Sequence, residues 1–474
     1  MTGERGVAIS LFSGAGGLDL GIEAAGYRCA AAVELNGDAA DTMEKNFPSL
    51  ESPVIRQDIL DVPTKEILRA AGLKGRERPE LLVGGPPCTP FSKSGFWLEW
   101  KRAGLDPDAS LLQAYTRVLA EAKPRAFILE NVYALTYNNT ASRPAFERLL
   151  REIKEAGYEC NWAVLNAADY GVPQLRPRLF IVGARKGLPT PTLPEPTHGG
   201  KWERRSTGDV ERPHVTVGEA LAGLQTTFEP EEVVRGQWQH LLPEVPPGDN
   251  YLHFTAERGH PDPVFNWRSR YWSFLLKLDP GRPSPTIQAQ PGPNVGPFHW
   301  ENRRLRVPEL KRLFTFPDDF EFVGRRASVQ AQVGNSVPPA LAAAVAMGLE
   351  VAPWAHRVAH RPGDAVLALA RGGHEAGAVE QVGVGGERQA PLAGDEVCVP
   401  QLASTPLRGV VAQIEHPGHL VERVGRDLAE LTHVDAVELG EPADGDRVGV
   451  RFGQLARLPA RQRSLRDPPP TVEP

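Results

Sequence analysis

The segment Leu11-Phe12-Ser13-Gly14-Ala15-Gly16-Gly17-Leu18 decides the fold of this chain. It follows an apolar run, Val7–Phe12, that is typical of a buried strand, and it leads into a helical pattern at Leu18–Ala25. A glycine-rich turn from strand to helix lets the backbone approach a nucleoside-containing cofactor closely, because glycine has no Cβ to block that approach. Most turns of this kind are only tight turns, so the segment by itself indicates an α/β fold and not a function.

The same alternation of β-rich runs and helical patterns continues to about Arg185, which predicts a doubly wound α/β sheet. Further strands are expected at Cys29–Val33, Pro53–Ile55, Leu81–Gly84, Ala126–Glu130, Cys160–Ala167 and Leu179–Gly183. Further helices are expected at Asp38–Asn46, Thr64–Ala71, Leu111–Lys123 and Ala145–Ala156. Ser142 is available as a cap near the start of the last of these helices.

The chain divides by composition into four parts. Residues 1–185 carry the α/β pattern, and residues 186–292 are rich in Pro, Gly and aromatic side chains, as expected of a smaller inserted domain. Residues 293–350 resume helical patterns at Val307–Phe314 and Val337–Leu349 and should return to complete the first domain. Residues 351–474 contain only two aromatic side chains, Trp354 and Phe452, and no lysine, so we expect a loosely packed tail of unknown role.

Composition limits the class of protein. Of the 474 residues, 41% are hydrophobic and 24% are charged, as in ordinary globular proteins. No apolar stretch approaches the roughly 20 residues of a membrane span, and Met1–Gly6 lacks the features of a signal peptide, so we expect a cytoplasmic protein. A formal net charge of −6 argues against a protein that coats nucleic acid non-specifically, but it permits a local basic face.

An acidic residue supports a cofactor site behind the glycine-rich segment. Glu34 ends the second expected strand, about 20 residues further on, where a carboxylate can accept hydrogen bonds from both ribose hydroxyls. Asp58 is placed to contact an adenine amino group, with Phe12 and Ile59 as apolar walls. A surface carboxylate is the alternative for Glu34. A nicotinamide dehydrogenase carries similar features, so these residues do not choose between hydride and methyl transfer.

The segment Gly84-Gly85-Pro86-Pro87-Cys88-Thr89-Pro90-Phe91-Ser92 leaves another expected strand at its carboxyl end. Its prolines stiffen the backbone and present the sulfur of Cys88 from a loop, where a thiolate can act as a nucleophile. The other cysteines are Cys29, Cys160 and Cys398, and no two cysteines form a Cys-x-x-Cys pair, so neither a disulfide framework nor a metal site is predicted. Cys29 and Cys160 lie in apolar strand runs and are interpreted as buried hydrophobic residues.

Five motifs resemble, in sequence and in order, those of the cytosine-5 DNA methyltransferase family. They are Phe-Ser-Gly-Ala-Gly-Gly at 12–17, Pro-Pro-Cys-x-x-Phe-Ser at 86–92, Glu130-Asn131-Val132, Gln174-Leu175-Arg176-Pro177-Arg178 and Gln332-Val333-Gly334-Asn335-Ser336-Val337-Pro338-Pro339. The resemblance extends from Val7 to about Leu349, is thinner between Lys186 and Arg282, and is absent from the tail. One departure is Phe314, which stands where members of the family usually have a polar residue.

The resemblance implies a Rossmann-like, class I S-adenosylmethionine-dependent methyltransferase domain with an inserted target-recognition domain. Cys88 would attack carbon 6 of a cytosine and thereby make carbon 5 nucleophilic enough to accept a methyl group. Glu130 would hold ring nitrogen 3 and the exocyclic amine, and Arg178 would contact the carbonyl oxygen, with Arg176 as the second basic candidate on the same face. The expected cofactor-binding residues are Phe12, Gly14, Gly16, Gly17, Glu34, Asp58, Ile59, Asn335 and Ser336.

The implied substrate is a cytosine in double-stranded DNA, which must leave the base stack before sulfur can reach it. Candidates for DNA contacts combine aromatic and basic side chains, and they are Phe265-Asn266-Trp267-Arg268-Ser269-Arg270-Tyr271-Trp272, Arg303-Arg304-Leu305-Arg306 and Lys311-Arg312. A bacterial modification enzyme is expected, monomeric, with a cognate restriction endonuclease encoded nearby but with no membrane partner.

Three alternatives remain. A cytosine-5 methyltransferase acting on transfer RNA shares this architecture, but that subgroup carries a Cys-Phe-Thr element that this chain lacks. A non-catalytic DNA-binding paralogue is disfavoured by intact Cys88, Glu130 and Arg178. A nicotinamide dehydrogenase would give the Pro-Pro-Cys and Glu-Asn-Val motifs no role.

Overall fold

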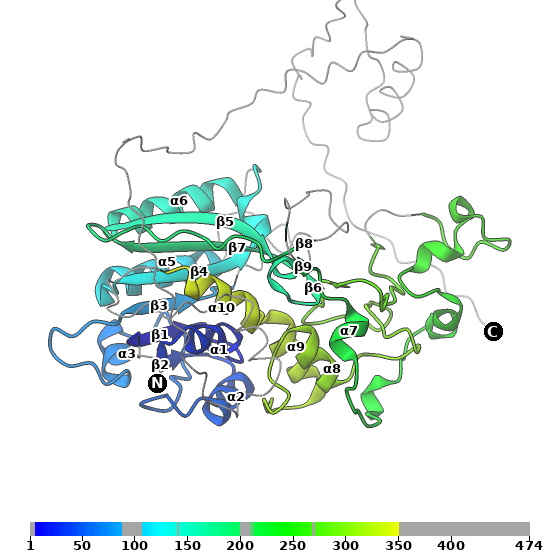
Figure 1. The fold of residues 1–474 in the computed structure, drawn as a ribbon, viewed down its shortest axis with the longest axis horizontal. Coiled ribbons are helices and arrows are strands. Elements are labelled where there is room, and N and C mark those ends of the chain that lie inside the picture. Colours follow the sequence, from blue (N-terminus) through cyan, green and yellow to red (C-terminus); the bar gives the residue numbers. More distant parts are fainter. Residues whose placement is uncertain are drawn as a thin grey trace, which may run out of the picture. The chain divides into compact units, whose positions relative to one another are not determined.

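The computed structural model describes residues 5–87, 107–139, 142–199, 210, 212–267 and 271–349, and the statements below concern these residues. Their framework is a six-stranded sheet with the order β2-β1-β3-β4-β7-β5 (Figure 1). The strands are β1 (Val7–Leu11), β2 (Arg28–Val33), β3 (Leu81–Gly84), β4 (Ala126–Val132), β5 (Tyr158–Asn166) and β7 (Pro177–Arg185). β2, β1, β3 and β4 run parallel, whereas β7 is antiparallel to both of its neighbours. This mixed sheet confirms the predicted α/β class.

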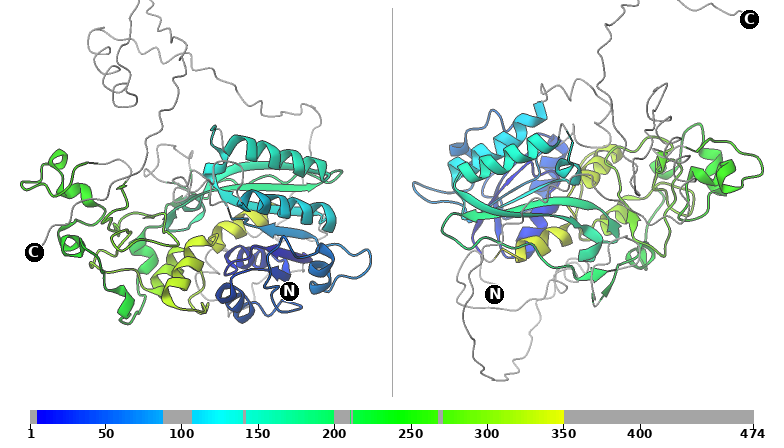
Figure 2. Two further views of the ribbon diagram at one scale, coloured as in Figure 1. Left: turned by 180° about the vertical axis from the view of Figure 1, so that it is seen from behind. Right: turned by 90° about the horizontal axis from the view of Figure 1, so that it is seen from above.

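Helices cover both faces of the sheet (Figures 1 and 2). One face packs against α3 (Thr64–Ala70), α5 (Pro107–Ala122) and α6 (Ser142–Glu155), and the other packs against α1 (Gly17–Ala24) and α10 (Pro339–Met347). Successive residues of a strand serve opposite faces, as their two-residue period requires. In β3, for example, Leu82 belongs to the first core and Val83 to the second.

One expected strand is not formed. Of Pro53–Ile55, only Ile55 bridges to β2, where its N–H donates to the carbonyl of Ala32 and its carbonyl accepts from the N–H of Glu34. Pro53 has no N–H with which to extend that ladder. The prediction of a full strand at this position was therefore wrong.

The cap predicted for α6 was also wrong. Ser142 is the first residue of this helix, and its N–H donates to Oδ1 of Asn139 at 2.7 Å. The side chain that accepts at the helix start therefore belongs to Asn139, three residues earlier.

Residues 186–292 form short elements, and residues 234–275 among them surround a small apolar core. The core contains Val234, Leu241, Leu242, Val245, Tyr251, Phe254 and Leu275, joined by Phe298. The partly buried ring of Phe265 packs against this core, with ring centroids of Trp238 at 5.0 Å and Phe274 at 5.6 Å. The elements are β8 (His198–Gly199), β9 (Arg212–Pro213), α7 (Val217–Leu221), η4 (Pro230–Glu232), η5 (Gln239–Glu244), η6 (Tyr251–Phe254), η7 (Ala256–Arg258) and β10 (Ser284–Pro285).

The following segment carries the chain back to the sheet. α8 (Val307–Leu313) and α9 (Arg326–Asn335) share an apolar cluster with α2 (Gly37–Asn46), and α10 then packs against α1. The sequence did not predict α9, because its apolar residues follow no clear helical period. No helix in the described part of the chain is long and apolar enough to cross a membrane.

Candidate active site

Several of the predicted site residues that the structure describes lie at one edge of the sheet. The chain passes from β1 to β2 on one side and later places β3 on the other side of β1, so the strand order reverses at β1. Open α/β sheets bind ligands at such a switch point, outside the carboxyl ends of the strands. The 12–17 loop, Glu34 and Glu130 all lie at these carboxyl ends, and Arg178 lies at the start of the antiparallel strand β7.

The three glycines of the loop are required for different physical reasons. Gly14 has φ +55°, and a Cβ there would meet nothing within 4 Å, so this position is open on its side-chain side. A Cβ on Gly16 would collide with Met43 and Phe47, and one on Gly17 would collide with the carbonyl of Val337. At Gly16 and Gly17, the absence of a Cβ makes room for other parts of the protein. The cofactor contacts predicted for these glycines remain predictions.

The carboxylate of Glu34 is held by two backbone amides. Its Oε2 accepts from the N–H of Gly14 at 2.7 Å, and its Oε1 accepts from the N–H of Asn36 at 2.8 Å. The side chain of Asn36 in turn accepts from Ala39 and caps α2. Asp58 lies half-buried after the Ile55 bridge, and its Oδ1 accepts from the N–H of Leu60 at 3.0 Å. Each acid therefore has a fixed orientation and retains acceptor capacity.

Exposed leucines accompany the apolar walls predicted for this edge, whose cofactor contacts remain predictions. Ile59 is 3% exposed and belongs to the core between the sheet and its helices, whereas Phe12 is half-buried against that core. Leu35 and Leu60, which follow Glu34 and Ile59 directly, are 65% and 47% exposed. Exposed leucines beside two carboxylates suit an amphipathic ligand. Sequence reasoning missed both, because their exposure could not be read from the pattern.

The two residues predicted in the return segment differ in accessibility. Asn335, the last residue of α9, is exposed. Ser336 is buried, and its hydroxyl donates to the carbonyl of Gln332 at 2.7 Å. The cofactor contacts predicted for them remain predictions.

Glu130 and Arg178 form a mostly buried ion pair. Nε of Arg178 lies 3.1 Å from Oε1 of Glu130, and the two side chains are 14% and 11% exposed. Burial raises the pKa of Glu130, because the charged form loses hydration, and the positive charges of Arg178 and Arg176 partly oppose that shift. A carboxyl group with a raised pKa is suited to hold or share a proton with a substrate.

The backbone that leads toward Cys88 is anchored beside this pair. A Cβ on Gly85 would lie 2.9 Å from Oε2 of Glu130, so glycine is the residue that fits against the carboxylate. The side-chain amide of Asn131 is buried and donates to the carbonyl of Pro86 at 3.1 Å. Sequence reasoning assigned Asn131 no role of its own, although its place directly after Glu130 was the available signal. Cys88 itself lies outside the described residues.

Arg176 is placed differently from Arg178. It is 1% exposed, and its guanidinium donates to the backbone carbonyls of Gly334 at 2.6 Å and Ser336 at 3.0 Å. Contact with the base, predicted for this residue, remains a prediction.

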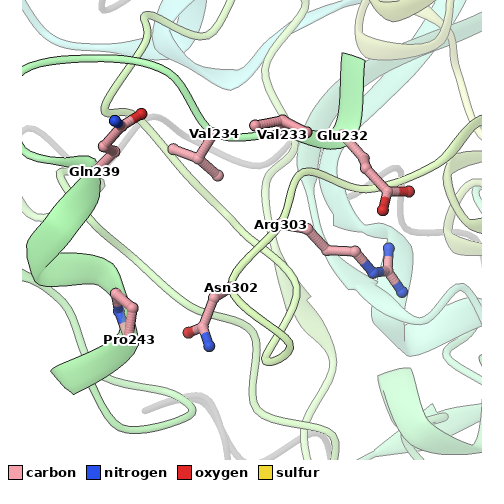
Figure 3. A pocket seen from close by; sticks show the side chains of 7 residues that line it. All are labelled: Glu232, Val233, Val234, Gln239, Pro243, Asn302 and Arg303. Atoms are coloured by element: carbon pink, nitrogen blue, oxygen red, sulfur yellow. The ribbon is translucent and has the colours of Figure 1, made fainter. Parts of the chain in front are cut away.

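A pocket of about 360 Å³ lies away from these residues (Figure 3). It is lined by Glu232, Val233, Val234, Gln239, Pro243, Asn302 and Arg303. Two of its polar groups are already engaged within the protein, since Glu232 pairs with Arg306 and Arg303 pairs with Glu309. None of the predicted cofactor or catalytic residues is among the described residues that line it.

The mixed sheet, the glycine-rich loop backed by an acidic residue, and the buried pair between β4 and β7 define a Rossmann-like class I methyltransferase domain. A solved structure described as a prophage-encoded DNA modification methyltransferase (E. coli) has the same fold, with a TM-score of 0.52 and 22% identity. The match covers 72% of this chain and 98% of that protein.

The chain belongs to the C-5 cytosine-specific DNA methylase family, whose sequence model matches residues 7–350. It is 50% identical over 364 residues to the type II methyltransferase M.SacI of Streptomyces achromogenes, covering 72% of this chain and 92% of that protein. It is 32% identical over 348 residues to M1.HphI of Haemophilus parahaemolyticus, covering 71% and 85%. These findings confirm the predicted enzyme class and do not favour the transfer-RNA enzyme or the non-catalytic paralogue.

Proposed function

We propose that this methylase uses S-adenosylmethionine to methylate carbon 5 of a cytosine flipped out of duplex DNA, with Cys88 as the nucleophile. The observation that carries the proposal is the buried Glu130–Arg178 pair on the β4–β7 ladder, beside the anchored Gly85-Pro86 backbone that precedes Cys88. A carboxyl group and a guanidinium are complementary to the polar edge of cytosine, which offers nitrogen 3, an exocyclic amine and a carbonyl oxygen.

The described residues fit the proposed cofactor. Gly14 is open on its side-chain side, Glu34 presents a fixed carboxylate that can accept from ribose hydroxyls, and exposed Leu35 and Leu60 offer apolar contacts for an adenine ring. Asp58 would accept from the adenine amino group, with Phe12, Gly16, Gly17 and Ile59 supporting the loop and Asn335 and Ser336 closing the site. When bound, S-adenosylmethionine supplies an electrophilic methyl group.

The residues of the chain perform the remaining chemistry. The thiolate of Cys88 adds to carbon 6, which breaks the aromaticity of the ring and makes carbon 5 nucleophilic. Glu130 holds nitrogen 3 and the exocyclic amine and stabilises the electron density that builds on the ring; its raised pKa favours the shared proton. Arg178 orients Glu130 and donates to the carbonyl oxygen. Once carbon 5 carries the methyl group, its proton is lost to a base from solvent, the C5–C6 double bond re-forms, and the C6–S bond breaks to release Cys88 as a thiolate.

The DNA side of the proposal rests on the inserted region. Residues 186–292 would read the target sequence, and Trp267, Tyr271 and Trp272, each at least 41% exposed, offer aromatic surface for contact with DNA. We place this monomeric enzyme in the cytoplasm, within a restriction–modification system whose endonuclease recognises the same sequence. The similarity to type II methyltransferases supports that setting.

The test uses a DNA duplex in which target cytosines are replaced by 5-fluorocytosine. Fluorine cannot leave carbon 5 as a proton does, so the protein should be recovered covalently attached to DNA in the presence of cofactor. The Cys88→Ser protein should give no adduct and still bind cofactor. Methyl transfer to transfer RNA in preference to DNA, or an adduct through another residue, would overturn the proposal.

A further inference from the structure

Arg176 is a fully buried cation that is held by backbone carbonyls. Its Nη2 donates to the carbonyls of Gly334 and Ser336, and its Nη1 donates to the carbonyl of Ile287 at 3.4 Å. Within the described residues, no carboxylate oxygen lies within ion-pair distance of it. The guanidinium carbon lies 5.0 Å from the centroid of the Phe314 ring, which is itself 0% exposed. Backbone carbonyls thus take three of its five N–H donors, whereas Nε is buried and has no hydrogen-bond partner among the described residues.

The carbonyls that Arg176 holds belong to the end of α9. In a continuing helix, the carbonyl of Gly334 would accept from the N–H of residue 338, but that residue is Pro338 and has no N–H. Arg176 supplies the missing donor. Because carbonyls at a helix C-terminus also carry partial negative charge, a cation is favourable at this position.

The turn after α9 packs directly against the cofactor loop. A Cβ on Gly17 would collide with the carbonyl of Val337 and would lie 3.1 Å from Cβ of Ser336. Gly17 is the first residue of α1 and the last glycine of the loop that contains Gly14 and Gly16. The position of the 336–337 turn therefore limits where the loop can lie.

The backbone of Arg176 is hydrogen-bonded to the end of β5, close in sequence to Arg178. Its N–H donates to Oδ1 of Asn166 at 2.9 Å, and its carbonyl accepts from the N–H of Ala167. Two residues later, Arg178 reaches Glu130. Arg176 thus connects two segments. One leads into β7, which carries Arg178, and the other is the turn after α9, which packs against Gly17 of the glycine-rich loop.

Phe314 accounts for the departure from the family pattern noted in the sequence. Its ring lies against the guanidinium of Arg176, an arrangement that is favourable for a cation removed from water. The neighbouring residue, Thr315, accepts through Oγ1 from the N–H of Ala340 at 3.1 Å, near the start of α10. The 314–315 segment therefore contacts both Arg176 and the helix that follows the turn.

We propose that Arg176 is a positioning residue that keeps the cofactor loop in register with the Glu130–Arg178 pair, acting through the 334–337 turn and with Phe314 as its apolar support. The proposal rests on the proposed function, since it assumes that the glycine-rich loop binds the cofactor and the Glu130–Arg178 pair binds the cytosine in one reaction. It differs from the expectation that Arg176 contacts the cytosine.

The test compares full-length Arg176→Met with Arg178→Met, which changes the same residue type two positions along the same segment. S-adenosylmethionine affinity is measured by calorimetry without DNA, and kcat and KM for cofactor are measured on duplex DNA. Arg176→Met should weaken cofactor binding and raise its KM by roughly tenfold or more, the effect of losing buried charged hydrogen bonds. Its turnover rate should recover partly as cofactor is raised to saturation, so kcat should fall less than kcat/KM. Arg178→Met should lose kcat and keep cofactor affinity within about twofold.

Two milder variants test the proposal even if Arg176→Met does not fold. Arg176→Lys keeps the charge but loses the planar guanidinium, so its KM for cofactor should lie between those of wild type and Arg176→Met. Phe314→Leu keeps Arg176 and an apolar side chain and should raise the cofactor KM by roughly threefold, a modest effect typical of losing a cation–π contact. If Arg176→Met does not fold, these two decide the question.

The proposal is overturned if cofactor affinity is unchanged while kcat collapses, which would indicate direct contact with the base. It is equally overturned if only the melting temperature falls. Wild-type protein is assayed first, because its failure to bind cofactor or methylate DNA would refute the proposed function and not the role of Arg176.

Discussion

Glu130 and Arg178 are diagonal neighbours on the β4–β7 ladder, where Glu130 pairs with Phe180 and Arg178 pairs with Val132. Diagonal residues on one face of an antiparallel pair lie close enough for long side chains to meet. Here they do, with Nε of Arg178 3.1 Å from Oε1 of Glu130. Because both side chains are mostly buried, the orientation of the carboxylate is set before any substrate arrives.

Replacement of Glu130 by Gln should reduce methyl transfer by roughly 10²–10⁴-fold, the usual contribution of a general acid–base group. The amide keeps the shape of the side chain but cannot share a proton with ring nitrogen 3. Cofactor affinity, measured by calorimetry, should change by less than about twofold. Glu147→Gln, an exposed acid on α6, is the matched control. Near-normal turnover in the Glu130 variant would remove this residue from the mechanism.

Gly85→Ala tests how tightly the carboxylate is positioned. The new methyl group would lie 2.9 Å from Oε2 of Glu130, so the carboxylate or the backbone before Cys88 must move. We expect kcat to fall by roughly tenfold to a hundredfold, as displacements of about 1 Å do at active sites. Gly37→Ala, where a Cβ meets nothing within 4 Å, should leave kcat unchanged. Equal kcat for the two alanine variants would show that Glu130 tolerates displacement.

The sequence predicted the α/β framework well because its strands are short apolar runs that end in turn residues. It placed β3 at Leu81–Gly84, as the structure does. It did not predict α9, whose position depends on long-range contacts such as those of Arg176 with its C-terminal carbonyls. It also predicted a full strand at Pro53–Ile55, where only Ile55 bridges to β2, because Pro53 has no N–H to extend the ladder.

The candidate site was predictable as a set of residue types, but the contacts within it were not. The motif Glu130-Asn131-Val132 pointed to Glu130, whereas only the structure shows Asn131 anchoring the carbonyl of Pro86. Likewise, Arg176 and Arg178 look equivalent in an extended segment. Their partners, backbone carbonyls for one and a carboxylate for the other, come from segments far apart in the chain.

Glu34→Ala should weaken cofactor binding on the order of 1.5–3 kcal/mol, the value of hydrogen bonds to a charged acceptor. Part of that loss would come from the loop itself, because Glu34 holds the N–H of Gly14. Glu34→Gln, which retains one acceptor oxygen, should lose less. Calorimetric titration with S-adenosylmethionine measures both, with the exposed Asp61→Ala as control. Unchanged affinity in Glu34→Ala would make Glu34 an ordinary surface carboxylate.

Asp19 should make stability depend on pH. Burial raises its pKa from 3.8 to about 6, although Oδ1 accepts from the thiol of Cys29 at 3.3 Å. Because the native state binds the proton more tightly than the unfolded chain, the free energy of unfolding should fall as pH rises from about 4 to about 6. The contribution is on the order of 3 kcal/mol for a shift of about two pKa units.

The measurement is urea unfolding of wild type and Asp19→Asn at several pH values. Asn stays neutral, so the stability of the variant relative to wild type should increase with pH across that window and then level off. Asp61→Asn, at an exposed position, should show no such trend. A constant difference between Asp19→Asn and wild type would contradict a raised native pKa.

The last prediction concerns residues 351–474, which lie outside the described residues. A chain truncated after Pro353 should fold and methylate DNA. The family match ends at residue 350, and α10, which packs against α1 beside the cofactor loop, ends at Met347. The tail has only two aromatic side chains, so it offers little large apolar surface to offset the entropy of ordering it. Melting temperature and specific methylation of residues 1–353 should match those of the full chain. Insolubility of the truncated protein, or loss of most of its activity with cofactor binding intact, would show that the tail is required for folding or for DNA recognition.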